Sequence, residues 1–344
     1  MSRRKKGIAF CLAVSLIVIG CGSPNSGSKG ERTVVANGEP LKLGYLICNS
    51  KEETVERFSA VAAYIGEKLG RKIIMYPMHT YQAQDVIKAE NIHYFKTNSI
   101  VYVQLHHYIG AEVMLGEKRG PLGRFTTGKI ISMKNSGIRE MKDLKGKKFA
   151  FGPMFAPFGY LVQYDLMLKA GINPEEDLAY YAIPWGAYKH EKTIYGIMFS
   201  GYDLASAPTL DWDLLKNQGK IRHEDFNVIA ESQKEPYCTF SHTKNADPQL
   251  TSEINKILLG VNDSTMVYMH PKRLEVISVE VSNDGKVKED HVKWDEEGFL
   301  RTGEVLNVNK AGKIQGYEKA VDSDYDSLRA MMKNVKMDPY VEFD

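Results

Sequence analysis

The sequence predicts an α/β protein built from two units. Its 344 residues allow two domains at the usual ~100–200 residues each. Short apolar runs alternate with amphipathic stretches along most of the chain, which is the pattern of α/β folds. The alternation restarts near residue 129, which indicates a boundary there. The 45 basic and 43 acidic residues give a net charge of +2, so charge offers no basis for nucleic-acid binding.

Residues 1–20 are predicted to be a secretory signal. A basic cluster from Arg3 to Lys6 precedes an uncharged run from Gly7 to Gly20. A helix of that length rises ~21 Å, which is short of the ~30 Å hydrocarbon core of a membrane. The segment therefore indicates a signal peptide rather than a stable membrane span.

The end of this segment, Val18-Ile19-Gly20-Cys21, resembles a bacterial lipobox, which predicts lipid on Cys21. The alternative is an N-terminal anchor helix in which Cys21 is incidental. Residues 21–38 are rich in Gly and Ser and read as a flexible tether. Removing residues 1–20 discards four basic residues and leaves a net charge of −2. Cys48 and Cys238 then remain, either as one disulfide or as two thiols.

The strands and helices follow from local patterns. Ser50 and Glu53 form an S-x-x-E capping box before a helix whose apolar residues, from Val55 to Leu69, recur at 3-4-3-4 spacing. A turn is expected at 96–98. Further strands are expected at 41–48, 72–76, 92–95, 129–133, 148–151, 179–183, 203–207, 226–231 and 237–242, and helices at 81–89, 158–170, 191–199, from 210, 247–259 and 323–335. Residues 279–316 are polar and turn-rich, with a hairpin signal at 283–285, and read as a surface excursion.

One stretch carries a family resemblance. Residues 136–160 (SGIREMKDLKGKKFAFGPMFAPFGY) resemble the phosphate/phosphonate-type solute-binding proteins of ABC importers. These commonly run S-G-I-x-x-L-x-D-L-K-G-K-x-F-A-F-G and then D-P-G-S-T-S-G-Y. The resemblance continues through Leu168–Glu175, Gly201–Asp203 and Leu210–Trp212, and covers about residues 41–259.

The resemblance implies a two-lobed periplasmic-binding-protein fold, with hinge strands and a central ligand cleft. The first lobe would comprise residues 39–128 and 233–344, including the 279–316 excursion. The second lobe would comprise residues 129–232. It implies capture of a small ligand, by family an anion like phosphate or phosphonate, and delivery to an ABC permease and its ATPase. The protein would be lipid-anchored outside the cytoplasm, with no catalytic role, cofactor or nucleic-acid partner. The alternative is a ligand sensor that signals to a membrane histidine kinase.

The sequence departs from the family where the anion should bind. The family's S-T-S hydroxyls, at a helix N-terminus that favours oxyanions, correspond to Ala156, Pro157 and Phe158. Only Gly159 and Tyr160 are kept. Lys96 appears in the loop after the third strand, either as a charged anion contact or as a solvent-facing turn residue. We therefore expect a smaller anionic group with an apolar or aromatic portion.

His190 corresponds by position to the family's phosphonate-contacting histidine, and as an alternative it is an exposed first-turn residue. Asn49 and Tyr81 are expected at the mouth of the cleft. Ser50 is expected either to contact the ligand there or to serve only as the cap of the following helix. The candidate ligand-binding residues are Asn49, Ser50, Tyr81, Lys96, Thr97, Asn98, Ser99, Phe158, Gly159, Tyr160, His190, Glu191 and Thr209.

The third class of function to consider, after transport and sensing, is a metal site or an enzyme. His106 and His107 with His93 suggest zinc. Adjacent helical residues point ~100° apart, so the pair does not converge as an i, i+4 pair would. No H-E-x-x-H, C-x-x-C, G-x-S-x-G or P-loop sequence occurs, so neither a metal nor catalysis is expected.

Overall fold

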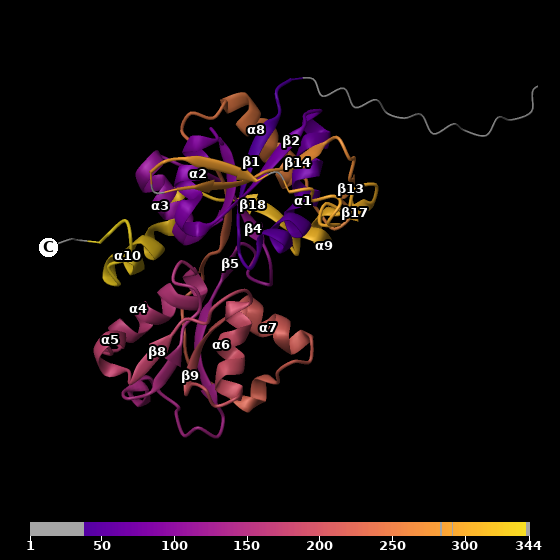
Figure 1. The fold of residues 1–344 in the computed structure, drawn as a ribbon. Coiled ribbons are helices and arrows are strands. Elements are labelled where there is room, and N and C mark those ends of the chain that lie inside the picture. Colours follow the sequence, from indigo (N-terminus) through magenta and orange to yellow (C-terminus); the bar gives the residue numbers. More distant parts are fainter. Residues whose placement is uncertain (1–37, 283, 291, 342–344) are drawn as a thin grey trace, which may run out of the picture. The chain divides into compact units, whose positions relative to one another are not determined.

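The largest sheet has seven strands and carries helices on both faces (Figure 1). In this computed structural model residues 38–341 are described, apart from 283 and 291. The predicted signal, Cys21 and nearly all of the tether lie outside the described residues. In spatial order the strands are β14 (Leu274–Val276), β2 (Ile73–Met78), β1 (Leu41–Leu46), β3 (Tyr94–Asn98), β12 (Cys238–His242), β4 (Glu112–Lys118) and β18 (Gly316–Lys319).

The first four of these strands are parallel, and β12 runs antiparallel to both β3 and β4. Helices α1 (Lys51–Leu69) and α8 (Pro248–Leu259) bury their apolar stripes on one face, in a core that includes Phe58 and Phe240. Helices α2 (Ala83–Ala89) and α3 (Ser99–Ile109) cover the other face around Phe95. The parallel strands therefore end at one common edge, where the loops after β1, β2 and β3 gather.

Helix α1 begins as the sequence predicts. Ser50 is the N-cap, and its hydroxyl accepts from the Glu53 amide at 3.1 Å. The Glu53 carboxylate accepts from the Asn49 side chain at 3.1 Å. Gly70 ends the helix in the left-handed conformation, at φ 63°.

A five-stranded sheet is formed by the middle of the chain, with the order β10 (Phe226–Glu231), β6 (Gly128–Met133), β9 (Leu204–Pro208), β7 (Lys148–Ala150) and β8 (Tyr180–Ala182). One face packs against the π-helical turn η3 (Pro157–Leu161) and α4 (Val162–Lys169), with the short α5 (Pro174–Asp177) beside α4. The other packs against α6 (Lys189–Met198) and α7 (Thr209–Asn217). The expected long helix from residue 158 is thus divided into a π-helical and an α-helical part.

The chain passes between the two sheets twice. Both passages join the antiparallel ribbon of β5 (Phe125–Thr126) and β11 (Glu235–Pro236), and Figure 1 shows β5 between the sheets. The last helix, α10 (Asp326–Asn334), packs against α3 and α4, so it touches elements of both sheets. We call the elements on the seven-stranded sheet the first lobe and those on the five-stranded sheet the second. The exact lobe limits stay a prediction.

Short elements complete the chain. The 279–316 region contains β16 (Val287–Asp290), paired with β15 (Ser278–Val281), then β17 (Val305–Asn307), paired with β13 (Met266–Tyr268), and α9 (Val308–Gly312). Single 3-10 turns are η1 (Thr80–Gln82), η2 (Met141–Leu144), η4 (His223–Asp225) and η5 (Asp322–Tyr325). In the described part of the chain, none of the helices has the length and apolar character needed to cross a membrane.

Candidate functional site

Two hydrogen bonds join the lobes at the ends of their parallel strands. The Asn98 side chain, at the end of β3, donates to the Phe155 carbonyl after β7 at 2.9 Å. The Tyr188 amide, between β8 and α6, donates to the Asn49 side-chain oxygen after β1 at 3.3 Å. Strand ends of both sheets therefore face one another, and ligands of α/β sheets characteristically bind at such carboxyl ends.

Tyr237 lies where the two lobes and the connecting ribbon meet. It follows β11 directly, and its ring contacts Phe158 of the second lobe edge-on, with centroids 5.6 Å apart. The Arg119 guanidinium of the first lobe lies 5.5 Å from the same ring. Burial, and then the nearby Cys238 and Asp211, raise the pKa of Tyr237 well above its ordinary value, so the phenol keeps its proton.

Lys96 is the most buried cation at this edge of the first sheet. Its side chain is 1% exposed, and the ammonium lies 4.2 Å from the centre of the Phe58 ring. The expectation of a turn at 96–98 was wrong, because β3 pairs with both β1 and β12 and so continues to Asn98. The solvent-facing alternative for Lys96 was wrong as well.

The charge on Lys96 has no acidic partner within the described residues, since no ion pair or hydrogen bond to its ammonium forms there. Burial lowers the pKa of Lys96, but the neighbouring Cys238 and Glu117 raise it by more than burial lowers it, and the result is a pKa of about 12. Lys96 is therefore protonated at neutral pH. The nearby Glu117 carboxylate is already engaged by Arg119 at 2.8 Å. A protonated ammonium that makes no hydrogen bond of its own can still donate to an anion beside it.

Other buried polar atoms nearby also lack partners among the described residues. The Tyr45 hydroxyl, one oxygen of Glu117 and the Ser99 hydroxyl are buried without a hydrogen bond. Tyr45 pairs with Lys96 across β1 and β3, and Ser99 follows β3. Buried polar atoms are nearly always paired, so such a group of exceptions indicates that a polar molecule or water belongs there.

The segment that replaces the family's hydroxyls is apolar and closely packed. Phe158 is 1% exposed. Behind it the Gly152 amide donates to the Gly159 carbonyl at 2.7 Å, and the His190 ring lies against both glycines. The Nδ1 atom of His190 is buried without a partner in the described structure. His190 is thus placed beside the predicted segment, whereas Tyr160 packs away from it, in the aromatic cluster of Phe151 and Tyr164.

The remaining predicted residues have other partners. Glu191 pairs with Lys220 at 3.5 Å, and the Thr97 hydroxyl bonds Thr239 at 3.3 Å. The Thr209 hydroxyl bonds Thr127 at 2.6 Å. Thr127 in turn donates to Glu231, which pairs with Lys129. Tyr81 is 72% exposed and stacks on His79. The structure thus places Phe158 against Tyr237, Asn98 opposite the neighbouring Cys238, His190 against Gly159, and, in the first lobe, Asn49 after β1 and Lys96 on the neighbouring strand β3. We call Tyr237 and the five predicted residues Asn49, Lys96, Asn98, Phe158 and His190 the interlobe site.

Both cysteines of the described chain are free thiols, with Cys48 exposed and Cys238 buried. Cys238 begins β12, Cys48 follows β1, and β3 lies between these strands. Two strand spacings separate the backbones by ~10 Å, beyond the ~7 Å that a disulfide spans. Burial raises the pKa of Cys238 to about 12, so this thiol stays protonated.

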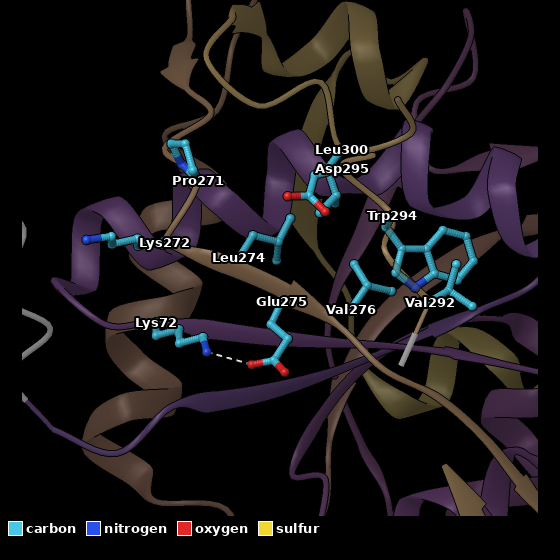
Figure 2. A pocket seen from close by; sticks show the side chains of 10 residues that line it. All are labelled: Lys72, Pro271, Lys272, Leu274, Glu275, Val276, Val292, Trp294, Asp295 and Leu300. Atoms are coloured by element: carbon cyan, nitrogen blue, oxygen red, sulfur yellow. Dashed lines mark hydrogen bonds and ion pairs between the residues drawn. The ribbon is translucent and has the colours of Figure 1, made fainter. Parts of the chain in front are cut away.

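Two cavities lie away from the interlobe site. One, of about 360 Å³, opens beside the edge strand β14, between Trp294 and the Lys72–Glu275 ion pair (Figure 2). The other, of about 790 Å³, lies between α8, β4 and Lys319. No predicted site residue lines either cavity. Across the described residues, no group of three or more His, Cys, Asp or Glu side chains is placed to hold a metal ion.

The chain matches a known protein family over most of its length. Residues 43–325 match the family described as "ABC transporter, phosphonate, periplasmic substrate-binding protein". The chain belongs to this family. Its membership confirms the resemblance carried by residues 136–160 and the two-lobed α/β fold expected from it.

Solved structures similar to this phosphonate-family protein share its fold at low identity. PhnD1 from Prochlorococcus marinus, bound to methylphosphonate, is 13% identical with a TM-score of 0.63, over 87% of this chain and 99% of its own. XAC2383 from Xanthomonas citri, bound to ATP, is 15% identical with a TM-score of 0.62, over 89% and 100%. Such identities show the fold alone.

A curated relative has a different role. The tetrathionate sensor histidine kinase TtrS of Salmonella typhimurium is 21% identical over 192 residues, which are 54% of this chain. The chain spans about a third (32%) of the length of that relative.

Sequence reasoning missed two residues beside the lobe junction of this binding protein, Tyr237 and Arg119, and one exposed loop residue, Trp185. Tyr237 and Arg119 are single residues in unremarkable segments, and only the fold brings them together. Trp185, between β8 and α6, is 92% exposed. Its one signal in the sequence is the Trp-Gly-Ala-Tyr run, which places two aromatic residues around a glycine. Local patterns reveal caps and strands, but contacts between distant segments leave no local pattern.

His190 predicts a pH dependence of stability in this binding protein. Burial lowers the pKa of His190 below its usual 6.5, although Asp211 opposes the shift. As pH falls below 6.5, the unfolded chain binds a proton before the folded protein does, so the free energy of unfolding must fall. We expect His190→Gln to lessen this loss when urea unfolding is followed between pH 7 and pH 5.

The matched control for that pH dependence is His79→Gln. Burial also lowers the pKa of His79. This variant should therefore remove a second, independent part of the decrease in the free energy of unfolding at acid pH. If the free energy of unfolding of His190→Gln falls between pH 7 and pH 5 as much as that of the unaltered protein, the assignment to His190 is contradicted.

Proposed function

We propose that this chain captures a small anion at the interlobe site and delivers it to an ABC permease. Lipid on Cys21 would hold it at the membrane, outside the cytoplasm. The observation that carries the proposal is Lys96, a buried and protonated side chain with no acidic partner in the described chain. The phosphonate family supports a solute-binding role. Three hydroxyls of the family are replaced here by Ala156, Pro157 and Phe158, which favours an anion with an apolar or aromatic portion over phosphate itself.

Binding at this place would favour the closed arrangement of the lobes. The bonds of Asn98 to Phe155 and of Tyr188 to Asn49 already cross from one lobe to the other. A ligand that contacts both lobes binds the closed state more tightly and shifts the population toward it. The permease would then recognise that closed state.

Calorimetric titration of the protein tests this proposal. The anions are phosphate, methylphosphonate, phenylphosphonate, acetate and benzoate. We expect at least one to bind with a micromolar Kd, and we expect an apolar or aromatic member to bind more tightly than phosphate. The absence of binding by all five would contradict the proposal. So would micromolar phosphonate binding that is insensitive to Lys96→Ala.

A second candidate is ligand sensing, which the similarity to TtrS over 54% of this chain favours. In that case the ligand-bound chain would signal to a membrane histidine kinase. Deleting the gene separates the two roles. Transport predicts lost uptake of the radiolabelled anion, restored by the intact chain and not by a variant that fails to bind. Sensing predicts unchanged uptake and a lost transcriptional response to the anion.

A further inference from the structure

Three large aromatic side chains are exposed in the loops that follow the parallel strands. Trp185 is 92% exposed and Tyr188 is 54% exposed, both in the segment between β8 and α6. Tyr81 is 72% exposed in η1, after β2. A fully buried aromatic ring removes 150–250 Å² from water, so rings left in solvent at functional loops are available for a ligand.

Strand order places the loops that carry these rings at the same end of the interlobe site. The Asn98–Phe155 bond joins the end of β3 to the segment after β7, and the Tyr188–Asn49 bond joins β8 to β1. In the sheets β1 neighbours β3, and β8 neighbours β7, so the two sheets meet strand by strand. Beyond β1, the next strand of the first sheet is β2, which leads to Tyr81. Beyond β7, the last strand of the second sheet is β8, which leads to Trp185 and Tyr188.

The backbone of the second-lobe loop is held in a fixed conformation. Tyr188 has φ 55° and ψ 39°, a left-handed conformation that costs a non-glycine residue about 1–2 kcal/mol. It is maintained by the bond to Asn49 and by the Lys192 amide, which donates to the Tyr188 carbonyl at 3.0 Å. The Lys192 ammonium donates to the Trp185 carbonyl at 2.7 Å. Such strain is found at ligand clamps, where the surroundings determine the conformation.

We propose that Trp185, Tyr188 and Tyr81 form an aromatic subsite at the open end of the interlobe site, which binds the planar part of an aromatic anion. This inference rests on the proposed function and names the ligand class: a small carboxylate or phosphonate that carries an aromatic ring. Lys96 holds the anionic group, and the exposed rings stack on the other end. Phe158 supplies an apolar wall where the family has hydroxyls.

The test compares two pairs of anions that differ by a ring: phenylphosphonate with methylphosphonate, and benzoate with acetate. Aromatic contacts add about 0.5–1.5 kcal/mol beyond the area buried, so we expect the ring to tighten binding about tenfold. Trp185→Ala should remove this preference and leave the affinity for methylphosphonate and acetate within about twofold. Trp185→Phe keeps a ring and should restore the preference.

Fluorescence gives a second readout on the full chain. The protein has three tryptophans, and Trp212 and Trp294 are each 3% exposed, so Trp185 is the accessible one. Phenylphosphonate should change the emission, and Trp185→Phe should abolish that change without abolishing binding. The control is Phe199→Ala, because Phe199 is 81% exposed at the other end of α6. This variant should bind all four anions as the unaltered protein does.

The outcomes separate the two proposals. Equal affinities within each pair, or a ring preference that survives Trp185→Ala, would overturn the aromatic subsite and leave the proposed function standing. An equal loss of the ring preference in Trp185→Ala and in Phe199→Ala would also overturn the subsite. If neither these four anions nor phosphate binds the unaltered protein, both the subsite and the anion-binding function are overturned.

Discussion

Lys96→Met is expected to weaken anion binding and to lower the stability of the folded protein. A hydrogen bond to a charged group contributes about 1.5–3 kcal/mol, so the affinity should fall about 10- to 100-fold. The folded state should be destabilised as well, because the pKa of Lys96 is raised to about 12, which means that the fold favours the charged ammonium over the neutral amine. Methionine keeps the apolar contact with Phe58 but loses the favourable charge interaction with Glu117. Calorimetry and urea unfolding measure the two effects separately.

Lys42→Met is the matched control for this prediction. Lys42 lies on β1 of the same sheet, and its ammonium pairs with Glu90 at 3.1 Å. Glu90 is buried, so removing its partner should destabilise the protein by about 1 kcal/mol without affecting anion affinity. Both variants should therefore be less stable, but only Lys96→Met should bind the anion more weakly. Unchanged affinity in Lys96→Met would place the anion elsewhere.

Local periodicity was sufficient to predict most helices and strands, because the apolar stripe of α1 and the cap at Ser50 depend on neighbouring residues. It failed at Lys96-Thr97-Asn98, three polar residues that resemble a turn. They form the end of β3 because strands pair on both sides, and pairing with β1 and β12 outweighs the preference of three residues. The cost of burying Lys96 there is itself an indication of function.

The candidate site was predictable only where the family pattern supplied positions. His190 and Phe158 were named in that way, and the structure places Phe158 against Tyr237 and His190 against the adjacent Gly159. Nothing in the sequence around Tyr237 indicates that Arg119 and Phe158 approach its ring from different lobes. Ser50, Glu191 and Thr209 were also named from the sequence, and the structure gives each of them another partner. Polar residues near strand ends often serve as caps or ion-pair partners, and only the three-dimensional contacts reveal which of them have free hydrogen-bonding capacity.

Gly159→Ala is expected to destabilise the protein through its contact with His190. A β-carbon at this position would lie 2.4 Å from Cε1 of His190 and 3.3 Å from the Gly152 α-carbon. The ring must move, although its Nδ1 side is buried. Overpacking of this kind costs about 1–3 kcal/mol, which urea unfolding would show as a lower midpoint with an unchanged slope. Because His190 belongs to the interlobe site, anion affinity should fall as well.

A second variant locates the cause of that loss. In the background of His190→Ala the ring is absent, so adding Gly159→Ala should cost much less than it does in the unaltered protein. Gly260→Ala is the control, because a β-carbon there meets its nearest atom, the Ile257 carbonyl oxygen, at 3.4 Å, an ordinary contact distance, and should change stability little. If Gly159→Ala costs the same with and without the His190 ring, the two residues do not touch. The family's glycine would then be retained for the backbone contact with Gly152, and His190 would be free to serve the ligand alone.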